Sequence, residues 1–462
     1  MRTKKPVQQT RVPVWPALVL AVLLFCIYNL NFRHGEGVDT VATTALPASI
    51  IAEGTFNLDR SRELLSTNTN ALDACLVYFG CIQERHGHLV SSYPVGAAIM
   101  AVPVFAVAKY AGYLKEWHHY RVAGKIAASS MVALSALFVF LTLSLSIETR
   151  AAWMIALFFG LGTSAWSISS QELWQHGPSA LCLAIATYAL CLLDRRPSHG
   201  TAFLAGFFLG FAVWCRLTNL IPAAALTLFI LIHHRKYLLS CIAPLALISA
   251  LIAYYNLTTF GNLSGGYDAI YQSKIHGWRN LNHSNVYSHP LWQGLADTLV
   301  SPSRGLLIYS PFLIPAFIAS IYLALRPQSA LHRYLILWVV LIGIVLAKNV
   351  FWWGGATFGP RYYGETCVAL ALLTGAAWPY IKRYRILQAA FLASGVLSIV
   401  IHGIGAFFAP CGWELTPVPN DLKLERHWDW RDTEIMRCAG AGMKTGFKPP
   451  EILLYRTGDK DR

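Results

Sequence analysis

The sequence predicts an all-α protein that crosses a membrane many times, and its composition and apolar pattern support this. Of 462 residues, 55% are hydrophobic and only 13% are charged, whereas a soluble domain carries about 25% charged residues. The apolar residues form long continuous runs, unlike the alternating pattern of a membrane β-barrel. These observations exclude a soluble globular chain, a disordered chain and a small disulfide-rich secreted scaffold.

The chain is basic, with 37 Lys and Arg against 23 Asp and Glu and a net charge of +14. No nucleic-acid motif and no basic tract with interleaved aromatics accompanies this charge. In a membrane protein, Lys and Arg collect in cytoplasmic loops and at anionic headgroups. Membrane lipids, and not nucleic acid, are therefore the expected partners of the basic residues.

The apolar runs divide the chain into six segments. Basic residues precede a run from about Val14 to Leu30, and no small-residue cleavage site follows it, which favours an uncleaved first helix over a signal peptide. The later runs bring the total to about 11 to 13 transmembrane helices. The predicted segments are an N-terminal tail and first helix (1–30), a first extracytoplasmic loop (31–93), an N-terminal transmembrane module (94–258), a second extracytoplasmic loop (259–304), C-terminal transmembrane helices (305–408) and a polar tail (409–462).

Charge predicts the orientation in a bacterial inner membrane. The short loops around Arg195, Arg235, Arg326 and Lys382 are basic, so we expect them on the cytoplasmic side together with the N-terminus. The two long loops and the C-terminal tail then lie outside. This arrangement requires that one run before residue 150 does not cross, and the run at 94–112 is the best candidate.

Four cysteines lie in polar segments, namely Cys75, Cys81, Cys411 and Cys438. They predict disulfides on an oxidising face such as the bacterial periplasm. Three pairings are possible, and four free thiols are the alternative.

The first loop begins with Glu36 and Asp39, just past the first membrane helix. A carboxylate at the membrane boundary can act as a general base in a partly desolvated site. Asp39 also precedes a plausible helix, where Asp is a favoured N-cap. Later in this loop, His86 and His88 give a weak metal signal, and a loop position without a metal is the simpler interpretation.

A polar and aromatic segment at 163–178 joins two apolar runs. Glu172 and His176 are four residues apart and would share one helical face. Together with Trp174 they suggest a carbohydrate pocket, and an interfacial aromatic belt is the alternative.

Single cations stand at the outer ends of several runs. A cation in such a position can snorkel to headgroups, but a group of arginines fits a site for a lipid-linked phosphate, because Arg binds phosphate in a bidentate manner. Glycines between Trp353 and Arg361 would allow close backbone approach. The cations concerned are Arg216, Arg304, Lys348 and Arg361.

At these residues the chain resembles the GT-C superfamily of integral-membrane glycosyltransferases, which includes relatives of protein O-mannosyltransferases and of lipid A aminoarabinose transferase. The similar stretches occur in order along most of the chain. They are GVDT (37–40), LP (46–47), EGTFNLD (53–59), GHLVSSYPVG (87–96), WQHGP (174–178), RLTN (216–219), SPSRGL (301–306), WGG to GPR (353–361) and RHWDWRD (426–432).

The resemblance implies a polyprenyl-phosphate sugar donor and a catalytic acid in the first extracytoplasmic loop, which Asp39 matches. The family often has two adjacent acids there, and this chain has Glu36 and Asp39 instead, so a divalent metal is possible but no metal ligand is assigned. The expected function is transfer of the sugar to a glycan, lipid or protein acceptor on the periplasmic side. A transporter or flippase of lipid-linked sugar, or a non-catalytic partner in envelope polysaccharide assembly, is the alternative.

The expected site therefore has Asp39 as general base and Arg216, Arg304 and Arg361 as ligands of the donor phosphate. Further substrate contacts are expected from Glu36, His88, Tyr93, Glu172, Trp174, His176, Lys348 and Trp353.

Overall fold

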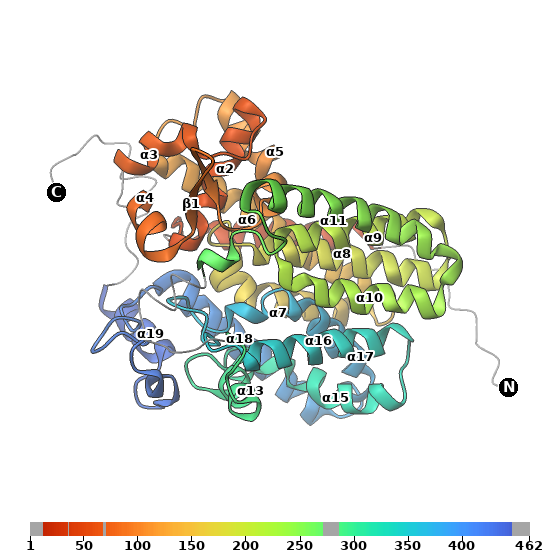
Figure 1. Ribbon diagram of the computed structural model, residues 1–462. Helices are drawn as coiled ribbons and strands as arrows, with labels where there is room; N and C mark the ends of the chain where they lie inside the picture. The colour runs from red at the N-terminus through yellow and green to blue at the C-terminus, as the bar shows by residue number, and fades with distance from the viewer. Residues whose placement is uncertain (1–12, 36, 68–70, 271–285, 446–462) are drawn as a thin grey trace.

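The computed structural model describes residues 13–35, 37–67, 71–270 and 286–445 (Figure 1). Within these ranges most residues are helical, and the described residues form one two-stranded sheet. A domain formed by the first loop and a segment formed by the C-terminal tail lie at one end of a long helical bundle (Figure 1). This architecture agrees with the all-α polytopic fold that the sequence predicts.

The first-loop domain begins with the 3₁₀ turn η1 (Val38–Thr40), which runs directly into α2 (Val41–Glu53). The residue at the N-cap position of α2 is Thr40 and not Asp39, so the capping role considered for Asp39 is wrong. The domain has its own apolar core, in which α2 packs against the chain around the disulfide Cys75–Cys81. Its remaining elements are η2 (Asp59–Ser61), α3 (Arg62–Thr67), α4 (Ala71–Asp73), the π-helical turn η3 (Ala74–Phe79), β1 (Ile82–Arg85) and β2 (His88–Ser91).

The two strands form a tight antiparallel hairpin in which Arg85 pairs with His88. His86 and Gly87 make the turn with φ of 53° and 80°, as a two-residue hairpin turn of matching twist requires. The His88 ring bonds the Asp59 carboxylate at 2.6 Å, and the Leu89 amide donates to the same carboxylate at 2.8 Å. The histidines of this stretch therefore have structural positions in the hairpin.

The bundle contains five helices that are long and apolar enough to cross a membrane by length and composition, within the described part of the chain. They are α6 (Trp117–Ser144), α8 (His176–Arg195), α11 (Leu238–Phe260) with the preceding turn η6 (Arg235–Tyr237), α16 (Leu331–Lys348) and α18 (Arg385–Phe408). Seven shorter apolar helices pack among them: α1 (Val14–Asn29), α5 (Gly96–Tyr110), α7 (Thr149–Leu161), α9 (His199–Cys215), α10 (Leu220–His233) with η5 (Leu217–Asn219), α15 (Ile314–Leu325) with η7 (Pro311–Leu313), and α17 (Thr366–Ile381). The protein is thus a multi-pass helical membrane protein.

Helix α5 begins at the same end of the bundle as α6. At its start, Gly96 packs so closely on the backbone of Trp214 that an added Cβ would lie 2.6 Å from the Trp214 carbonyl carbon. At the start of α6, Arg121 donates to the Gly35 carbonyl at 2.6 Å. Both contacts lie beside the first-loop domain, so α5 returns to this end without crossing the bundle. The sequence predicts this course for the run at 94–112.

The C-terminal tail folds onto the same end of the bundle as the first-loop domain (Figure 1). It contains η9 (Leu424–Trp428) and α19 (Glu434–Thr445), and α19 packs on α18. A second disulfide joins Cys411 to Cys438 within it. Between α11 and α15 the described chain adds α13 (Leu291–Val300) and α14 (Leu306–Tyr309), and before α8 the π-helical turn η4 (Ala165–Ser169).

Candidate active site

A cavity of about 270 Å³ lies where the first-loop domain meets the helical bundle. This is close to the lower end of the ~300–1,000 Å³ range of small-molecule sites. Its walls come from six parts of the chain: η1, the loop after β2, the start of α8, the turn after α9, the segment after α11, and the α16–α17 connection with the 3₁₀ turn η8 (Arg361–Tyr363). Six of the predicted site residues line it: Asp39, Tyr93, Trp174, His176, Arg216 and Arg361.

Asp39 and Arg361 form an ion pair at the cavity wall, although 322 residues separate them in sequence. Arg361 Nη1 donates to Asp39 Oδ2 at 3.1 Å, with side-chain exposures of 7% and 20%. Burial raises the pKa of the Tyr93 phenol, and Asp39 raises it further by charge and by a side-chain hydrogen bond. Tyr93 therefore stays a neutral donor beside the carboxylate.

A second charge group lies on another wall and centres on Glu365. Arg216 Nη1 donates to Glu365 Oε1 at 2.5 Å, and the His176 ring bonds Glu365 Oε2 at 2.8 Å. The Glu365 side chain is only 3% exposed. Burial opposes ionisation of Glu365, but the charges of Arg216 and His176 outweigh it and lower its pKa to about 2. The carboxylate thus fixes both basic side chains at the cavity.

Tyr362 contacts both arginines of the cavity. The guanidinium carbon of Arg216 lies 5.5 Å from the centre of the Tyr362 ring, and that of Arg361 lies 5.3 Å from the same ring. The guanidinium carbon of Arg361 also lies 4.8 Å from the centre of the Trp174 ring. Contacts of this kind attract a cation to the ring face, so the aromatic rings orient both guanidinium groups without neutralising them.

Glu172 holds the loop that carries Asp39. Its Oε2 accepts from the Gly37 amide at 2.8 Å and from the Thr40 hydroxyl at 2.7 Å. The predicted shared helical face of Glu172 and His176 is wrong, because α8 begins only at His176 and Glu172 precedes it in a turn. Burial raises the pKa of Glu172, while the hydrogen bonds from Thr40 and Gly37 oppose this rise.

The structure places several other predicted site residues away from the cavity. His88 is in the hairpin, and Arg304 is buried in an ion pair with Glu434, from which its Nη1 lies 2.5 Å. The Trp353 indole donates to Asp421 at 2.5 Å. Lys348 is the last residue of α16, and its neighbour Asn349 lines the cavity instead. Glu36 lies outside the described residues.

The described residues contain no cluster of three His, Cys, Asp or Glu side chains that could hold a metal ion. Asp39 is directed to Arg361, and His176 to Glu365. These side chains are therefore committed to charge partners and do not fit a metal-ligand set.

Glu365 and Tyr362 were not identified as site residues from the sequence. Glu365 stands inside the apolar run at 363–381, and a carboxylate is costly at such a position unless it has a partner. An acidic residue within an apolar run was therefore the sequence signal that could have identified Glu365 as a site residue. Tyr362 gave no comparable signal, because an aromatic residue at the end of a membrane helix is ordinary.

No protein-family model matches the sequence, and no curated protein is similar to it in sequence. Solved structures are similar in fold. ArnT from Cupriavidus metallidurans bound to undecaprenyl phosphate matches with a TM-score of 0.50 and 14% identity, over 85% of this chain and 71% of ArnT. The Archaeoglobus fulgidus oligosaccharyltransferase in complex with zinc and sulfate matches with a TM-score of 0.57 and 14% identity, over 89% of this chain and 57% of that enzyme.

Both of these proteins are GT-C glycosyltransferases. The chain therefore has the GT-C membrane fold, as its sequence motifs suggested. It spans little more than half the length of the oligosaccharyltransferase.

Proposed function

We propose that the protein is a membrane glycosyltransferase that moves a sugar from a polyprenyl phosphate to a hydroxyl group of a glycan, lipid or protein. One observation carries the proposal: a carboxylate, Asp39, and two arginines, Arg216 and Arg361, converge from distant parts of the chain on one cavity. The fold shared with ArnT, whose structure contains undecaprenyl phosphate, supports the donor class.

In this mechanism Asp39 is the general base. The acceptor hydroxyl loses its proton to Asp39 while its oxygen bonds to the anomeric carbon, on the face opposite the phosphate. The bond from that carbon to the phosphate oxygen breaks, and the electron pair leaves with the polyprenyl phosphate. Because this leaving group departs as an anion, no general acid is needed, and one carboxylate is sufficient.

Arg216 and Arg361 stabilise the departing phosphate. Positive groups that are already oriented toward developing charge lower the barrier most, since they need no reorganisation during the reaction. Glu365 and the Tyr362 ring provide this orientation. The Nε of Arg361 is buried without a hydrogen-bond partner among the described residues, as expected for a guanidinium beside an anion site.

The proposed location is the periplasmic side of a bacterial inner membrane. The start of α8 and the end of α16 lie at the cavity. The opposite ends of these helices carry the basic residues Arg195, Arg196 and Arg333. By the positive-inside rule, the basic ends are cytoplasmic and the cavity is extracytoplasmic.

The test uses purified protein in nanodiscs with a panel of radiolabelled polyprenyl-phosphate sugars and candidate acceptors. Release of free polyprenyl phosphate is followed for wild type, for Asp39→Asn, and for Asp73→Asn as a control at an exposed acid of the same domain. We expect one sugar to turn over, with turnover lost in Asp39→Asn alone. Wild-type turnover by Asp39→Asn would remove the base assignment. Donor binding without turnover for any acceptor would favour the transporter.

A further inference from the structure

The C-terminal tail reaches the loop that carries Arg361. Glu434 at the start of α19 is completely buried. Its Oε2 accepts from the backbone amide of Gly359 at 3.0 Å, from the Tyr309 hydroxyl at 3.1 Å, and from Arg304 Nη1. Gly359 is two residues before Arg361, and its carbonyl accepts from the Arg361 amide at 3.0 Å. One tail carboxylate therefore holds the backbone next to an arginine of the cavity.

Arg304 holds the other part of the same loop. Its Nε donates to the Trp353 carbonyl at 3.0 Å, and its Nη2 donates to the Gly355 carbonyl at 3.2 Å. Gly354 packs on the side chain of Arg361, because a Cβ added there would lie 3.2 Å from Arg361 Cγ. Arg304 and Glu434 together thus fix the loop 353–361 at three backbone positions.

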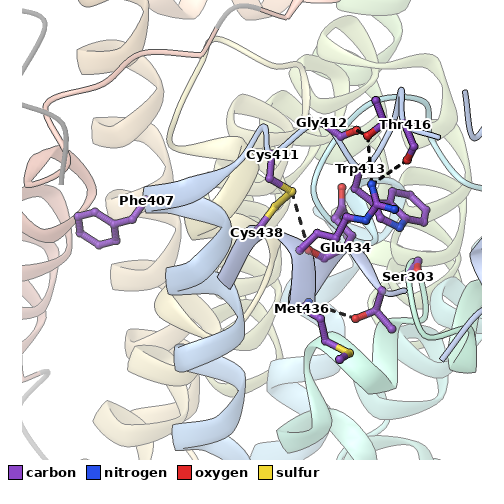
Figure 2. Close-up of a disulfide and its surroundings, with 12 residues drawn as sticks. Ser303, Phe407, Cys411, Gly412, Trp413, Thr416, Glu434, Met436 and Cys438 are labelled. Carbon is purple, nitrogen blue, oxygen red and sulfur yellow. Dashed lines mark hydrogen bonds between the residues drawn. A yellow bond between two sulfur atoms is a disulfide. The ribbon is translucent and has the colours of Figure 1, made fainter. Parts of the chain in front are cut away.

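The tail folds around Glu434. The disulfide Cys411–Cys438 lies beside it, and Trp413 and Ser303 lie on its other side (Figure 2). The Trp413 ring contacts two guanidinium groups, whose central carbons lie 5.2 Å (Arg304) and 4.8 Å (Arg426) from its centre.

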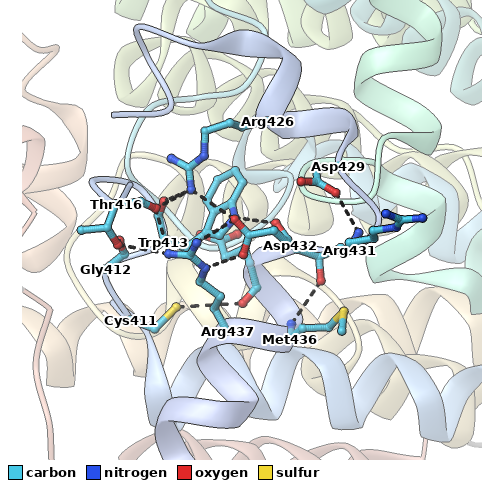
Figure 3. Close-up of polar contacts among 12 residues, drawn as sticks. Cys411, Gly412, Trp413, Thr416, Arg426, Asp429, Arg431, Asp432, Met436 and Arg437 are labelled. Atoms are coloured by element: carbon cyan, nitrogen blue, oxygen red, sulfur yellow. Dashed lines mark hydrogen bonds and ion pairs between the residues drawn. The ribbon is translucent and has the colours of Figure 1, made fainter. Parts of the chain in front are cut away.

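Further hydrogen bonds within the tail fix the segment that contains Trp413. Arg426 donates to the carbonyls of Trp413 and Thr416, at 2.7 and 2.6 Å, and the Trp413 indole donates to the Asp432 carbonyl at 2.8 Å (Figure 3). Arg437 pairs with the Asp432 carboxylate (Figure 3). The position of Glu434 is therefore determined by the fold of the whole tail.

We propose that the tail segment 409–445 is a clamp that positions Arg361 for the donor phosphate, with Glu434 and Arg304 as its positioning residues. This inference rests on the proposed function for the identity of the anion. The clamp gives Arg304 a different role from the direct phosphate contact expected from the sequence. Arg304 acts through the loop, and it is buried against Glu434 instead of lining the cavity.

The first experiment measures hydrogen–deuterium exchange of the full chain in nanodiscs without any donor. Glu434→Gln replaces one carboxyl oxygen by an amide group and keeps the size of the side chain. We expect exchange in residues 353–361 to rise at least tenfold, with residues 37–40 unchanged. Glu425→Gln, a control at an exposed acid of the same tail, leaves both segments unchanged. Equal exchange in residues 353–361 for Glu434→Gln and wild type would overturn the clamp.

Tyr309→Phe is the second variant, for the case that Glu434→Gln does not fold. It removes the hydroxyl that donates to Glu434 and to the Ser303 carbonyl, and it leaves the contact between Arg304 and Glu434 intact. We expect a smaller rise, about threefold, confined to residues 353–361. No rise there, or an equal rise throughout the bundle, would contradict the clamp.

The second experiment separates positioning from general stability by measuring binding of polyprenyl phosphate and of polyprenol. We expect Glu434→Gln to weaken the binding of polyprenyl phosphate about tenfold and to leave the binding of polyprenol unchanged. Because the clamp acts through Arg361, adding Glu434→Gln to Arg361→Gln should weaken phosphate binding no further. Equal weakening of both ligands, or additive losses, would refute positioning. If wild type binds neither ligand, the proposed function fails, and the exchange experiment still decides the clamp.

Discussion

At the scale of single residues, the site is a set of paired charges with little exposure to water. Asp39 pairs with Arg361, and Glu365 pairs with Arg216. Removing charges from water is costly, and this cost is offset only where geometry and further hydrogen bonds are good. Such pairs are weak evidence for stability but strong evidence for fixed orientation. The arginines are therefore held before any substrate arrives.

Replacing Arg361 tests its role directly. We expect Arg361→Gln to lower kcat/KM for the donor by about 100-fold, the usual effect of losing one oriented donor. Arg361→Lys should recover little, because an ammonium cannot reproduce a planar group held between Trp174 and Tyr362. Donor kinetics measure this, with Arg383→Gln, an exposed cation after α17, as control. Full activity of Arg361→Lys would mean that charge alone matters.

Glu365 predicts a dependence of stability on pH. Its folded pKa of about 2 lies below the ordinary 4.5, so the unfolded chain takes up the proton first as pH falls. The ion-pair contribution is complete above about pH 4.5 and is lost as pH falls through about 2. Between these pH values, the stability of Glu365→Gln should change less with pH than that of wild type. Thermal unfolding at a series of pH values measures this dependence. Unchanged slopes would show that Glu365 is not held ionised by its partners.

At the scale of elements, the position of Asp39 depends on the contact between η1 and the turn before α8. Gly37 has a φ of −63°, which any residue can adopt, so only space requires glycine there. A Cβ at this position would lie 2.8 Å from both Glu172 Oε2 and the Trp174 ring. The close packing of these two segments therefore sets where the carboxylate stands.

Gly37→Ala should move η1 and lower turnover about tenfold or more, since overpacking costs about 1–3 kcal/mol. Turnover and donor affinity of this variant are compared with those of Gly440→Ala, where an added Cβ meets open space in α19. Equal turnover of the two variants would show that η1 tolerates displacement.

At the scale of the whole molecule, both disulfides and the cavity lie at one end of the bundle, and the basic loops lie at the other. Thiol labelling in intact cells of a bacterial host measures the resulting orientation. An impermeant reagent should label Arg85→Cys, in the hairpin of the first-loop domain, without permeabilisation. Arg196→Cys, in the loop after α8, should react only after the membrane is opened. The reverse pattern would place the cavity in the cytoplasm and contradict the orientation.

The sequence by itself determined the class of the protein. Continuous apolar runs with few charges can be satisfied only by membrane helices, because backbone groups in lipid must bond within their own segment. The sequence also identified six residues of the cavity, including Asp39. A polar group at the end of a membrane helix is costly, so its presence indicates a functional or structural role.

Only the tertiary structure decided which polar residues act together. Arg304 and Arg361 have similar sequence settings, yet Arg304 is buried against Glu434 from the tail, whereas Arg361 and its partner Asp39 line the cavity. Disulfide pairing was likewise open among three choices and was settled as Cys75–Cys81 and Cys411–Cys438 by proximity in the fold. The physical reason is that local patterns reveal the cost of burying a charge, but the partner that offsets this cost can come from any part of the chain.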